Sequence, residues 1–233
     1  MDPLQMTELQ FSTATRQHAE EIEKFMFTEF RVNEPITVSL KATEEELSEF
    51  FHDLSESGYS NEKYSTIVHQ GDRLVAICLC SVNTYDDSIE HDTPEIDSEP
   101  HDYAKEIAQG PYRDHKANQL VTFVGALEQR QRELLGKSCK VMKIDIICVS
   151  TDAKGRGLGK ELTRKSVEIA RAEGCDWVAT AATAAASQAV FSRMGFQTMY
   201  EIPYTNFTEH GEPVFKNLHD GCQSGKFMAL RVN

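Results

Sequence analysis

The sequence predicts an α/β fold in which helices pack against a mixed sheet. Three observations carry this prediction. Residues 142–149 are mostly apolar and rich in β-branched side chains, and three spaced glycines and a helical pattern follow them directly. Residues 65–69 and 73–82 flank a Gln-Gly-Asp turn, as in a β-hairpin. Strand and helix patterns run through the chain in the order β-α-α-β-β-α-β-α-β-α-β-β. We expect one domain over residues 1–233, because there is no internal repeat and no domain boundary.

Each expected element has a local signal. Pro35 keeps Glu34 out of helical geometry after the first helix. The run Thr43-Glu-Glu-Glu46 is a capping box that begins the second helix, and Gly58 is its expected end. The expected strands are residues 9–15, 65–69, 73–82, 142–149, 176–180, 196–204 and 226–232. The expected helices are residues 18–30, 43–56, 118–135, a helix from Leu158 to a stop at Gly174, and 187–196, closed by Gly195.

Residues 84–117 are predicted to form an irregular acidic insert. They contain three prolines and many acidic residues, and they show no sustained periodicity. Four residues in the insert have side chains that bind metals elsewhere, namely His91, Asp92, His101 and Asp102. Their spacing fits no familiar metal cage, so we expect no metal site.

The composition is that of a soluble globular protein, with 40% hydrophobic and 26% charged residues among 233. No apolar run approaches 18 residues, and the N-terminus lacks the pattern of a secretory signal. The six cysteines mostly lie in apolar, strand-like segments, which favours buried reduced thiols in a cytoplasmic protein over disulfides. The formal charge of −13 argues against nucleic-acid binding and would suit a cationic small molecule. We expect no membrane association and a monomer.

The glycine-rich turn predicts a phosphate-bearing ligand. Gly155, Gly157 and Gly159 alternate with basic residues, and unpaired backbone N–H groups at a helix start form an anion site. A P-loop needs four residues between its first glycine and Gly-Lys, whereas three stand here. A dinucleotide fingerprint needs a glycine at the position of Lys160. The alternative is a glycine-rich turn that binds no ligand.

The run Lys154-Gly-Arg-Gly-Leu-Gly159 resembles the acetyl-CoA signature of the GNAT N-acetyltransferases, Arg/Gln-x-x-Gly-x-Gly/Ala, with Lys154 at the position of the usual Arg or Gln. The Met-Gly-Phe196 turn is similar to the family's usual Gly-Phe. The resemblance implies a mostly antiparallel mixed sheet with splayed central strands and flanking helices, and acetyl-CoA as co-substrate. Its pantetheine would lie along Ile147, Cys148 and Val149. The pyrophosphate would be held by Lys154, Gly155, Arg156, Gly157, Leu158, Gly159 and Lys160.

A narrower resemblance is to the invertebrate arylalkylamine (dopamine-type) N-acetyltransferases. Asn33-Glu-Pro-Ile36 is similar to their Asp-Glu-Pro-Leu element, and Thr183-x-x-x-Ser187 is similar to their pair of serines. Glu201-x-x-Tyr204 and residues 211–219 resemble their C-terminal pattern. The resemblance implies that Glu34 is the catalytic base. The departures at Asn33, Ile36 and Thr183 leave the amine specificity open.

The chemistry explains why such an enzyme needs a base. An alkylammonium has a pKa of about 10, so it must lose a proton before its nitrogen attacks a thioester. Glu34 is the candidate base and could also attract the cation; alternatively it caps a turn or pairs with Arg31. His219 is a candidate relay at the amine pocket, although a lone histidine is often structural. Aromatic residues could stack on an aryl ring or belong to the core, namely Phe30, Tyr59, Tyr64, Phe123 and Tyr204.

The groups that act on the thioester are less clearly marked. The backbone N–H of Val149 is the expected donor to the developing oxyanion. Ser187 could protonate the departing sulfur or hydrogen-bond the cofactor, and Thr183 could position Ser187 or relay a proton; alternatively each hydroxyl caps a helix. Many GNAT enzymes carry a tyrosine four or five residues before the Gly-Phe turn, and this chain has Phe191 there.

These features predict an acetyl-CoA-dependent N-acetyltransferase that acts by direct attack in a ternary complex. The expected acceptor is a small arylalkylamine such as dopamine, serotonin, tyramine or octopamine. Alternatives are a polyamine or protein-amine acetyltransferase, or a catalytically silent acyl-CoA-binding protein.

Overall fold

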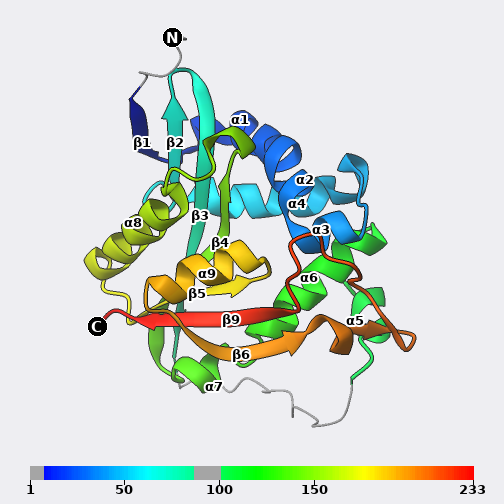
Figure 1. Cartoon of the computed structure of the whole chain (residues 1–233). Helices are drawn as coiled ribbons and strands as arrows, with labels where there is room; N and C mark the ends of the chain where they lie inside the picture. Colours follow the sequence, from blue (N-terminus) through cyan, green and yellow to red (C-terminus); the bar gives the residue numbers. More distant parts are fainter. Residues whose placement is uncertain (1–7, 87–100) are drawn as a thin grey trace.

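A seven-stranded mixed sheet forms the centre of the molecule, with helices on both faces (Figure 1). The computed structural model describes residues 8–86 and 101–233. The strand order is β1-β2-β3-β4-β5-β9-β6, and only β4 and β5 pair in parallel. The predicted mixed, mostly antiparallel sheet is thus confirmed. The strands are β1 (Leu9–Thr13), β2 (Thr66–Gln70), β3 (Arg73–Tyr85), β4 (Cys139–Val149), β5 (Trp177–Ala182), β6 (Gln197–Pro203), β9 (Ser224–Arg231), and a separate pair, β7 (Thr208–Glu209) and β8 (Glu212–Pro213).

Two hydrophobic clusters fasten the helices to the two faces of the sheet. Phe25, Phe51 and Phe123 belong to the cluster on the face covered by α1, α4 and α6, and Leu162 and Phe191 belong to the cluster under α8 and α9. The helices are η2 (Arg16–His18), α1 (Ala19–Phe25), η3 (Met26–Phe30), α2 (Arg31–Asn33), α3 (Pro35–Ser39), α4 (Glu44–Ser60), α5 (Ala104–Ala108), α6 (His115–Glu128), α7 (Gln131–Leu135), η4 (Thr151–Ala153), α8 (Leu158–Ala172), α9 (Ala185–Arg193) and η5 (Tyr204–Asn206).

The two central strands separate after a short common stretch. β4 and β5 pair only over Val141–Lys143 and Trp177–Ala179, although β4 continues to Val149 along β3. The hydroxyl of Thr180 donates to the carbonyl of Ile144 at 3.0 Å, which is where the regular pairing stops. A bulge lies beside this point, because Ile144 and Ile146 face consecutive residues of β3 and leave Asp145 without a partner in the register. The central strands are therefore splayed, as the resemblance to the GNAT family implied.

The first helix is longer and less regular than predicted. It continues through a π-helical turn at Met26–Phe30 and on to Asn33, and α3 begins at once with Pro35. Between them Glu34 is extended, with φ −75° and ψ 121°, because the ring of Pro35 disfavours helical geometry in the residue before it. The sequence thus predicted the break at Glu34 correctly and missed the helix that follows it.

Two further predictions about helices are wrong. Gly58 does not end the second helix, which runs to Ser60; Gly58 is buried, and its Cα faces Leu79. The predicted helix over 118–135 consists of α6 and α7, separated by a turn at Gln129 and Arg130. The insert at 84–117 is irregular only in part, because α5 and the start of α6 lie within it. Residues 87–100, including His91 and Asp92, lie outside the described residues.

All six cysteines are buried and unbridged, in agreement with the expectation of reduced thiols. Within residues 8–86 and 101–233, no helix has both the length and the apolar character that a bilayer crossing requires.

The close contact at Gly58 makes a stability prediction. A Cβ at this position would lie 2.7 Å from Cβ of Leu79, so Gly58→Ala should destabilise the protein by about 1–3 kcal/mol despite its better helix propensity. Gly125 in α6 is the matched control, because a Cβ there has no neighbour within 4 Å. Gly125→Ala should stabilise the protein by about 0.5–1 kcal/mol. Urea unfolding measures both changes, and equal effects would contradict the packing argument.

Candidate active site

The glycine-rich turn after β4 adopts a backbone that favours glycine. Gly155 and Gly157 have φ of 79° and 77°, in the left-handed region. Gly157 is the N-cap of α8, so the first backbone N–H groups of that helix have no partner within it. No heavy atom lies within 4 Å of a Cβ placed at either glycine. These open donors at a helix start fit a diphosphate group.

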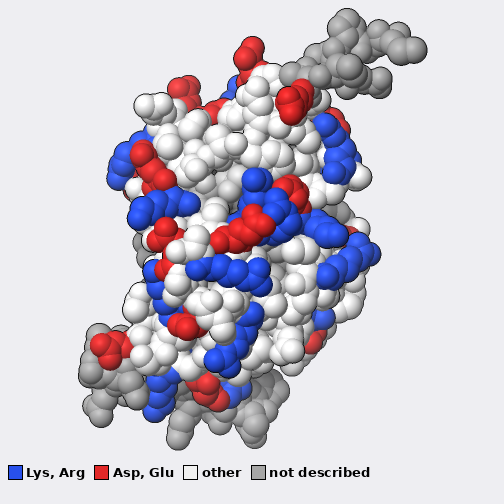
Figure 2. Space-filling view, turned by 90° about the vertical axis from the view of Figure 1, so that its left-hand side faces the viewer, with Lys and Arg blue, Asp and Glu red and all other residues white. Residues whose placement is uncertain are grey.

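The surface around this turn carries charges of both signs. On the face that α8 covers, Lys and Arg side chains are interspersed with Asp and Glu side chains (Figure 2). Arg164 of α8 pairs with Glu161 and Glu168, so its charge is compensated. Lys154 instead reaches toward the first helical segment, where its Nζ donates to Oδ1 of Asn33 at 3.0 Å.

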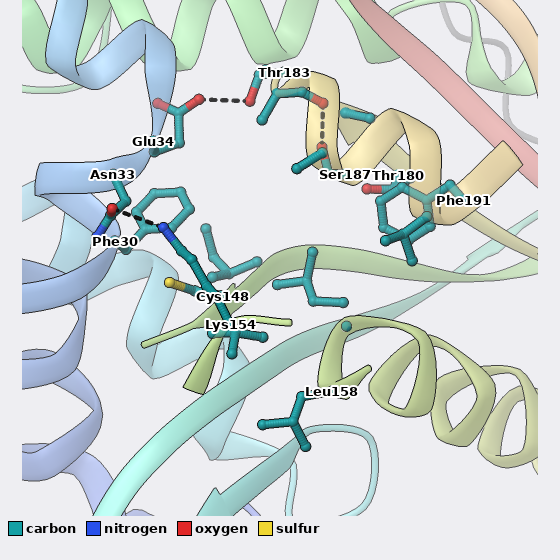
Figure 3. A pocket seen from close by; sticks show the side chains of 18 of the residues that line it. Phe30, Asn33, Glu34, Cys148, Lys154, Leu158, Thr180, Thr183, Ser187 and Phe191 are labelled. Atoms are coloured by element: carbon teal, nitrogen blue, oxygen red, sulfur yellow. Dashed lines mark hydrogen bonds between the residues drawn. The ribbon is translucent and has the colours of Figure 1, made fainter. Parts of the chain in front are cut away.

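A cavity of about 610 Å³ extends from this turn into the splay between β4 and β5 (Figure 3). Arg156 does not line it; its guanidinium donates to Oε1 of Gln70 at 2.9 Å. The cavity brings together the other residues predicted to hold the cofactor, namely Ile147, Cys148, Val149, Lys154, Gly155, Gly157, Leu158, Gly159, Lys160 and Ser187.

The end of β4 presents a free edge to this cavity. The backbone N–H of Ser150 donates to the carbonyl of Val75 in β3 at 2.8 Å. Because successive N–H groups of a strand point to opposite edges, the N–H of Val149 points into the splay. Cys148 lies beside it, and burial raises the pKa of its thiol to about 12, so the thiol stays protonated at neutral pH.

A second cavity, of about 290 Å³, lies between β4 and the helices of the opposite face. Most of its wall is apolar. The lining residues are Phe30, Glu34, Ile36, Thr37, Phe50, Asp53, Leu54, Tyr112, Leu120, Val121, Val124, Gly125, Glu128, Lys143, Asp145, Ile146, Ala181 and Thr183. Two of its carboxylates, those of Glu34 and Asp145, also line the first cavity.

Glu34 is held by neutral donors. Its carboxylate accepts hydrogen bonds from both the N–H and the hydroxyl of Thr37, at 2.7 and 2.6 Å, and from the N–H of Ile36 at 3.3 Å. The hydroxyl of Thr183 donates to it at 2.8 Å from the other side of the cavity (Figure 3). Glu34 thus caps α3 and also faces both cavities. It does not pair with Arg31, which bonds Glu44.

Burial sets the protonation behaviour of Glu34. The residue is 8% exposed, and desolvation raises its pKa above the ordinary 4.5, although the hydrogen bonds from Thr37, Thr183 and Ile36 oppose that shift. A carboxylate with a raised pKa accepts a proton more readily, which is the property that a general base requires near neutral pH.

Thr183 lies in the turn between β5 and α9, and Ser187 lies in the first turn of α9. Ser187 lines the first cavity, and its hydroxyl donates to the carbonyl of Ala184 at 2.9 Å. Neither hydroxyl caps α9, because Ala184 is the N-cap. The hydroxyl of Tyr204, in the C-terminal part of the chain, donates to the carbonyl of Thr183 and so holds that residue in place. The two predicted hydroxyls are thus close in the chain and make separate contacts.

Comparisons with known proteins identify a family for part of this chain. Residues 84–196 match the model of the acetyltransferase (GNAT) family. Residues 84–196, slightly less than half of the chain, thus carry the match to a GNAT acetyltransferase domain. Its activity in coarse terms is acetyl transfer from acetyl-CoA to an amino group. No match to a curated protein sequence was found.

Several solved structures share the fold of this GNAT domain. Arylalkylamine N-acetyltransferase 2 from Aedes aegypti has a TM-score of 0.75 at 20% identity, with 97% of this chain and 100% of that chain covered. A polyamine N-acetyltransferase from Drosophila melanogaster, which forms N-acetylagmatine, has a TM-score of 0.72 at 15% identity, with 96% and 100% covered. The C-terminal condensation domain of Ebony, in complex with β-alanyl-dopamine, has a TM-score of 0.71 at 14% identity, with 97% and 100% covered.

Other predicted residues lie away from the first and second cavities, in whole or in part. His219 is exposed and lines neither cavity. Of the aromatic group, Phe30 lines both cavities, whereas Tyr59, Phe123 and Tyr204 are buried in the core and Tyr64 packs at its edge. No group of three or more His, Cys, Asp or Glu residues in the described parts of the chain could hold a metal ion.

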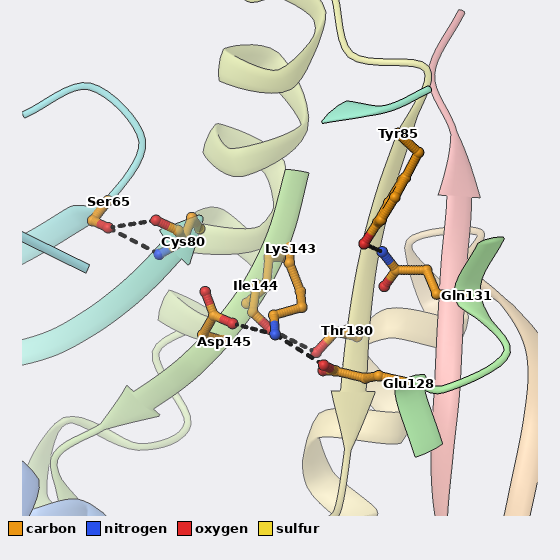
Figure 4. Close-up of polar contacts among 9 residues, drawn as sticks. All are labelled: Ser65, Cys80, Tyr85, Glu128, Gln131, Lys143, Ile144, Asp145 and Thr180. Carbon is orange, nitrogen blue, oxygen red and sulfur yellow. Dashed lines mark hydrogen bonds and ion pairs between the residues drawn. The ribbon is translucent and has the colours of Figure 1, made fainter. Parts of the chain in front are cut away.

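Sequence analysis missed a charged group in the wall of the second cavity. Nζ of Lys143 contacts Oε2 of Glu128 at 2.9 Å and Oδ1 of Asp145 at 3.0 Å (Figure 4). Burial raises the pKa of Glu128, although Lys143 lowers it. The signal was present in the sequence, because Lys143 and Asp145 interrupt an otherwise apolar strand.

The raised pKa of Glu34 predicts a pH-dependent stability. The folded protein keeps a proton on Glu34 at pH values where the unfolded chain has lost it, so this residue's contribution to stability falls as pH rises from about 4.5 through the folded pKa. Glu34→Gln should remove this loss. In urea unfolding from about pH 4 to about pH 8, the variant should gain stability relative to wild type as pH rises. The exposed Glu44→Gln is the control; parallel curves for wild type and Glu34→Gln would contradict the prediction.

The glycine turn makes a second prediction. Gly157→Ala should strain the backbone by about 1–2 kcal/mol and move the first N–H groups of α8. We expect the dissociation constant for acetyl-CoA, measured by calorimetry, to rise about tenfold. Gly211→Ala is the matched control, since Gly211 has a similar φ of 80° outside both cavities. Equal weakening by both substitutions would contradict a local role for the turn.

Proposed function

We propose that the chain acetylates a small primary arylalkylamine, such as dopamine, serotonin, tyramine or octopamine, by direct attack in a ternary complex with acetyl-CoA. The observation that carries the proposal is the position of Glu34. Its carboxylate lines both the cavity beside the glycine turn and the second cavity. A base at such a junction can reach an amine that enters from one side and attacks a thioester held on the other.

The apolar wall of the second cavity supports an aryl substrate. Phe30, Phe50 and Tyr112 supply aromatic surface, and aliphatic side chains complete the wall. Aromatic rings gain from such contacts through their large apolar area and their preference for tilted or offset packing. A volume of about 290 Å³ is at the lower end of ligand pockets, which suits a compact amine.

Each polar group at the junction has a distinct role in the proposed reaction. Glu34 takes one proton from the ammonium, whose pKa of about 10 keeps it protonated in water. Thr183 holds the Glu34 carboxylate in place. The amine nitrogen then forms a bond to the acyl carbon while the carbon–sulfur bond breaks, and the N–H of Val149 stabilises the charge that develops on the oxygen.

Ser187 is the proposed proton donor to the departing sulfur. The nitrogen loses its second proton as the amide forms, and this proton replaces the one that Ser187 gives to the sulfur. Acetyl-CoA supplies the activated acetyl group as a thioester. Phe191, which stands at the usual tyrosine position, is only 1% exposed and has no proton to donate.

A polyamine or a protein amine is the second candidate acceptor. Three carboxylates line the second cavity, those of Asp53, Glu128 and Asp145. Among the described lining residues, the cation that opposes them is Lys143. A cavity with this excess of carboxylates favours substrates with more than one positive charge. The third possibility is a protein that binds acetyl-CoA without turnover. Its sole support is that Phe191 stands where many GNAT enzymes carry a tyrosine.

The test is thiol release from acetyl-CoA with a panel of amines. The panel contains tyramine, dopamine, serotonin, spermidine and a lysine peptide, each assayed with wild type and Glu34→Gln. We expect the aryl amines to have the highest kcat/KM, and the variant to lose about 100-fold or more, since general bases contribute 10²–10⁴-fold. The wild-type kcat/KM should rise with pH through an apparent pKa above 4.5, because Glu34 acts in its ionised form.

Glu44→Gln serves as the control, because Glu44 lies outside both cavities and should leave kcat/KM unchanged. A preference for spermidine or the peptide would replace the aryl substrate with the second candidate. Acetyl-CoA binding without turnover on any amine would make the chain a binding protein. Full activity of Glu34→Gln would exclude this residue as the base.

A further inference from the structure

Asp145 has a buried carboxylate oxygen without a hydrogen-bond partner. Its Oδ1 contacts Nζ of Lys143 at 3.0 Å, whereas Oδ2 accepts no hydrogen bond from any described residue. The side chain is only 9% exposed, so water does not satisfy it as it would a surface carboxylate. A buried acceptor without a partner is destabilising unless a donor meets it.

The place of Asp145 in the fold indicates which donor that is. Asp145 is the bulged residue of β4, at the point where β4 leaves β5. With Glu34, it is one of the two carboxylates that line both cavities. The proposed function brings the acceptor nitrogen to this same junction, and a primary ammonium carries three N–H donors.

Lys143 fixes the orientation of Asp145, and Glu128 in turn holds Lys143 (Figure 4). One lysine and two carboxylates leave the group with a net charge of −1. A cation that approaches this group therefore completes its charge balance, whereas a neutral ligand leaves it unbalanced. The ion pair with Lys143 also keeps Asp145 on the wall of the cavity rather than free to rotate.

The two junction carboxylates differ in their partners. Glu34 contacts only neutral donors, those of Ile36, Thr37 and Thr183, whereas Asp145 contacts a cation. The lysine holds the Asp145 carboxylate in a fixed position against the cavity wall, while the buried Glu34 carboxylate, whose pKa is raised, is suited to take up a proton. Their environments therefore assign them different tasks.

We propose that Asp145 is a substrate-binding residue that holds the ammonium group of the acceptor amine through its Oδ2, and that Lys143 and Glu128 are its positioning residues. The inference rests on the proposed function for the placement of the amine. It adds a second anionic contact, so that one carboxylate binds the substrate's charge and the other removes its proton.

The test uses a dead-end complex, in which CoA replaces acetyl-CoA and tyramine binds without reacting. Calorimetric titration of tyramine into the CoA complex should give a dissociation constant about ten- to a hundredfold higher for Asp145→Asn than for wild type. The dissociation constant for CoA should change by less than about twofold. Unchanged tyramine binding in Asp145→Asn would overturn the proposal.

Asp53→Asn is the matched control, because Asp53 lines the same cavity but is exposed and bonds the hydroxyl of Tyr112 at 3.1 Å. It should alter tyramine binding by less than about threefold. If both substitutions weaken binding equally, the cavity's general negative charge is responsible and the specific contact is wrong.

A second measurement does not depend on the folding of the Asp145 variant. In Glu34→Gln, Asp145 is the remaining carboxylate that lines both cavities. Tyramine should still bind this variant about tenfold more tightly than tyrosol, its neutral alcohol analogue, whereas equal affinities would overturn the proposal. Wild type that binds CoA but no amine would contradict the proposed function itself. Acetylation by wild type with normal tyramine binding by Asp145→Asn would refute only the role of Asp145.

Discussion

The divergence of β4 from β5 is the constraint on which the rest of the structure depends. A sheet continues to pair as long as neighbouring backbones can reach each other, and here pairing ends after Lys143, where a bulge and the hydroxyl of Thr180 replace it. The separation frees the N–H edge of β4, and both cavities lie beside it. The two cavities share Glu34, Asp145 and Thr183 in their walls. Without the divergence, the turn at Gly157 and the carboxylate of Glu34 would lie on opposite sides of a closed sheet.

Glu34 shows how a local rule and a distant contact combine to make a reactive group. Pro35 holds Glu34 in an extended conformation, and the same residue then caps the helix that Pro35 begins. Thr183, 149 positions further along the chain, completes its hydrogen bonds. Burial then raises the pKa of Glu34 against the effect of those bonds. The carboxylate is therefore held rigidly by neutral groups while it keeps a tendency to bind a proton.

Sequence reasoning predicted the features whose causes are local. The glycine-rich turn that opens α8, the break at Glu34 and the capping box at Thr43 each follow from a few neighbouring residues. It failed where the cause is distant. Gly58 lies within its helix and packs against Leu79. Helix propensity, which depends on neighbouring residues in the sequence, does not reveal that contact. The second cavity was invisible for the same reason, since Glu128 and Lys143 meet only when α6 lies across the sheet.

The contact between Lys154 and Asn33 has a consequence for how the two ligands influence each other. It ties the glycine-rich turn to the residue immediately before Glu34, and the three donors of its ammonium group leave Lys154 able to bond a second acceptor besides Asn33. Glu34 lines both cavities, so a ligand that moves Lys154 and Asn33 in the first cavity would also act on the wall of the second. By thermodynamic linkage, whatever factor the cofactor applies to the affinity for the amine, the amine applies to the affinity for the cofactor. Titration of each ligand in the presence and absence of the other would measure the coupling as a single free energy.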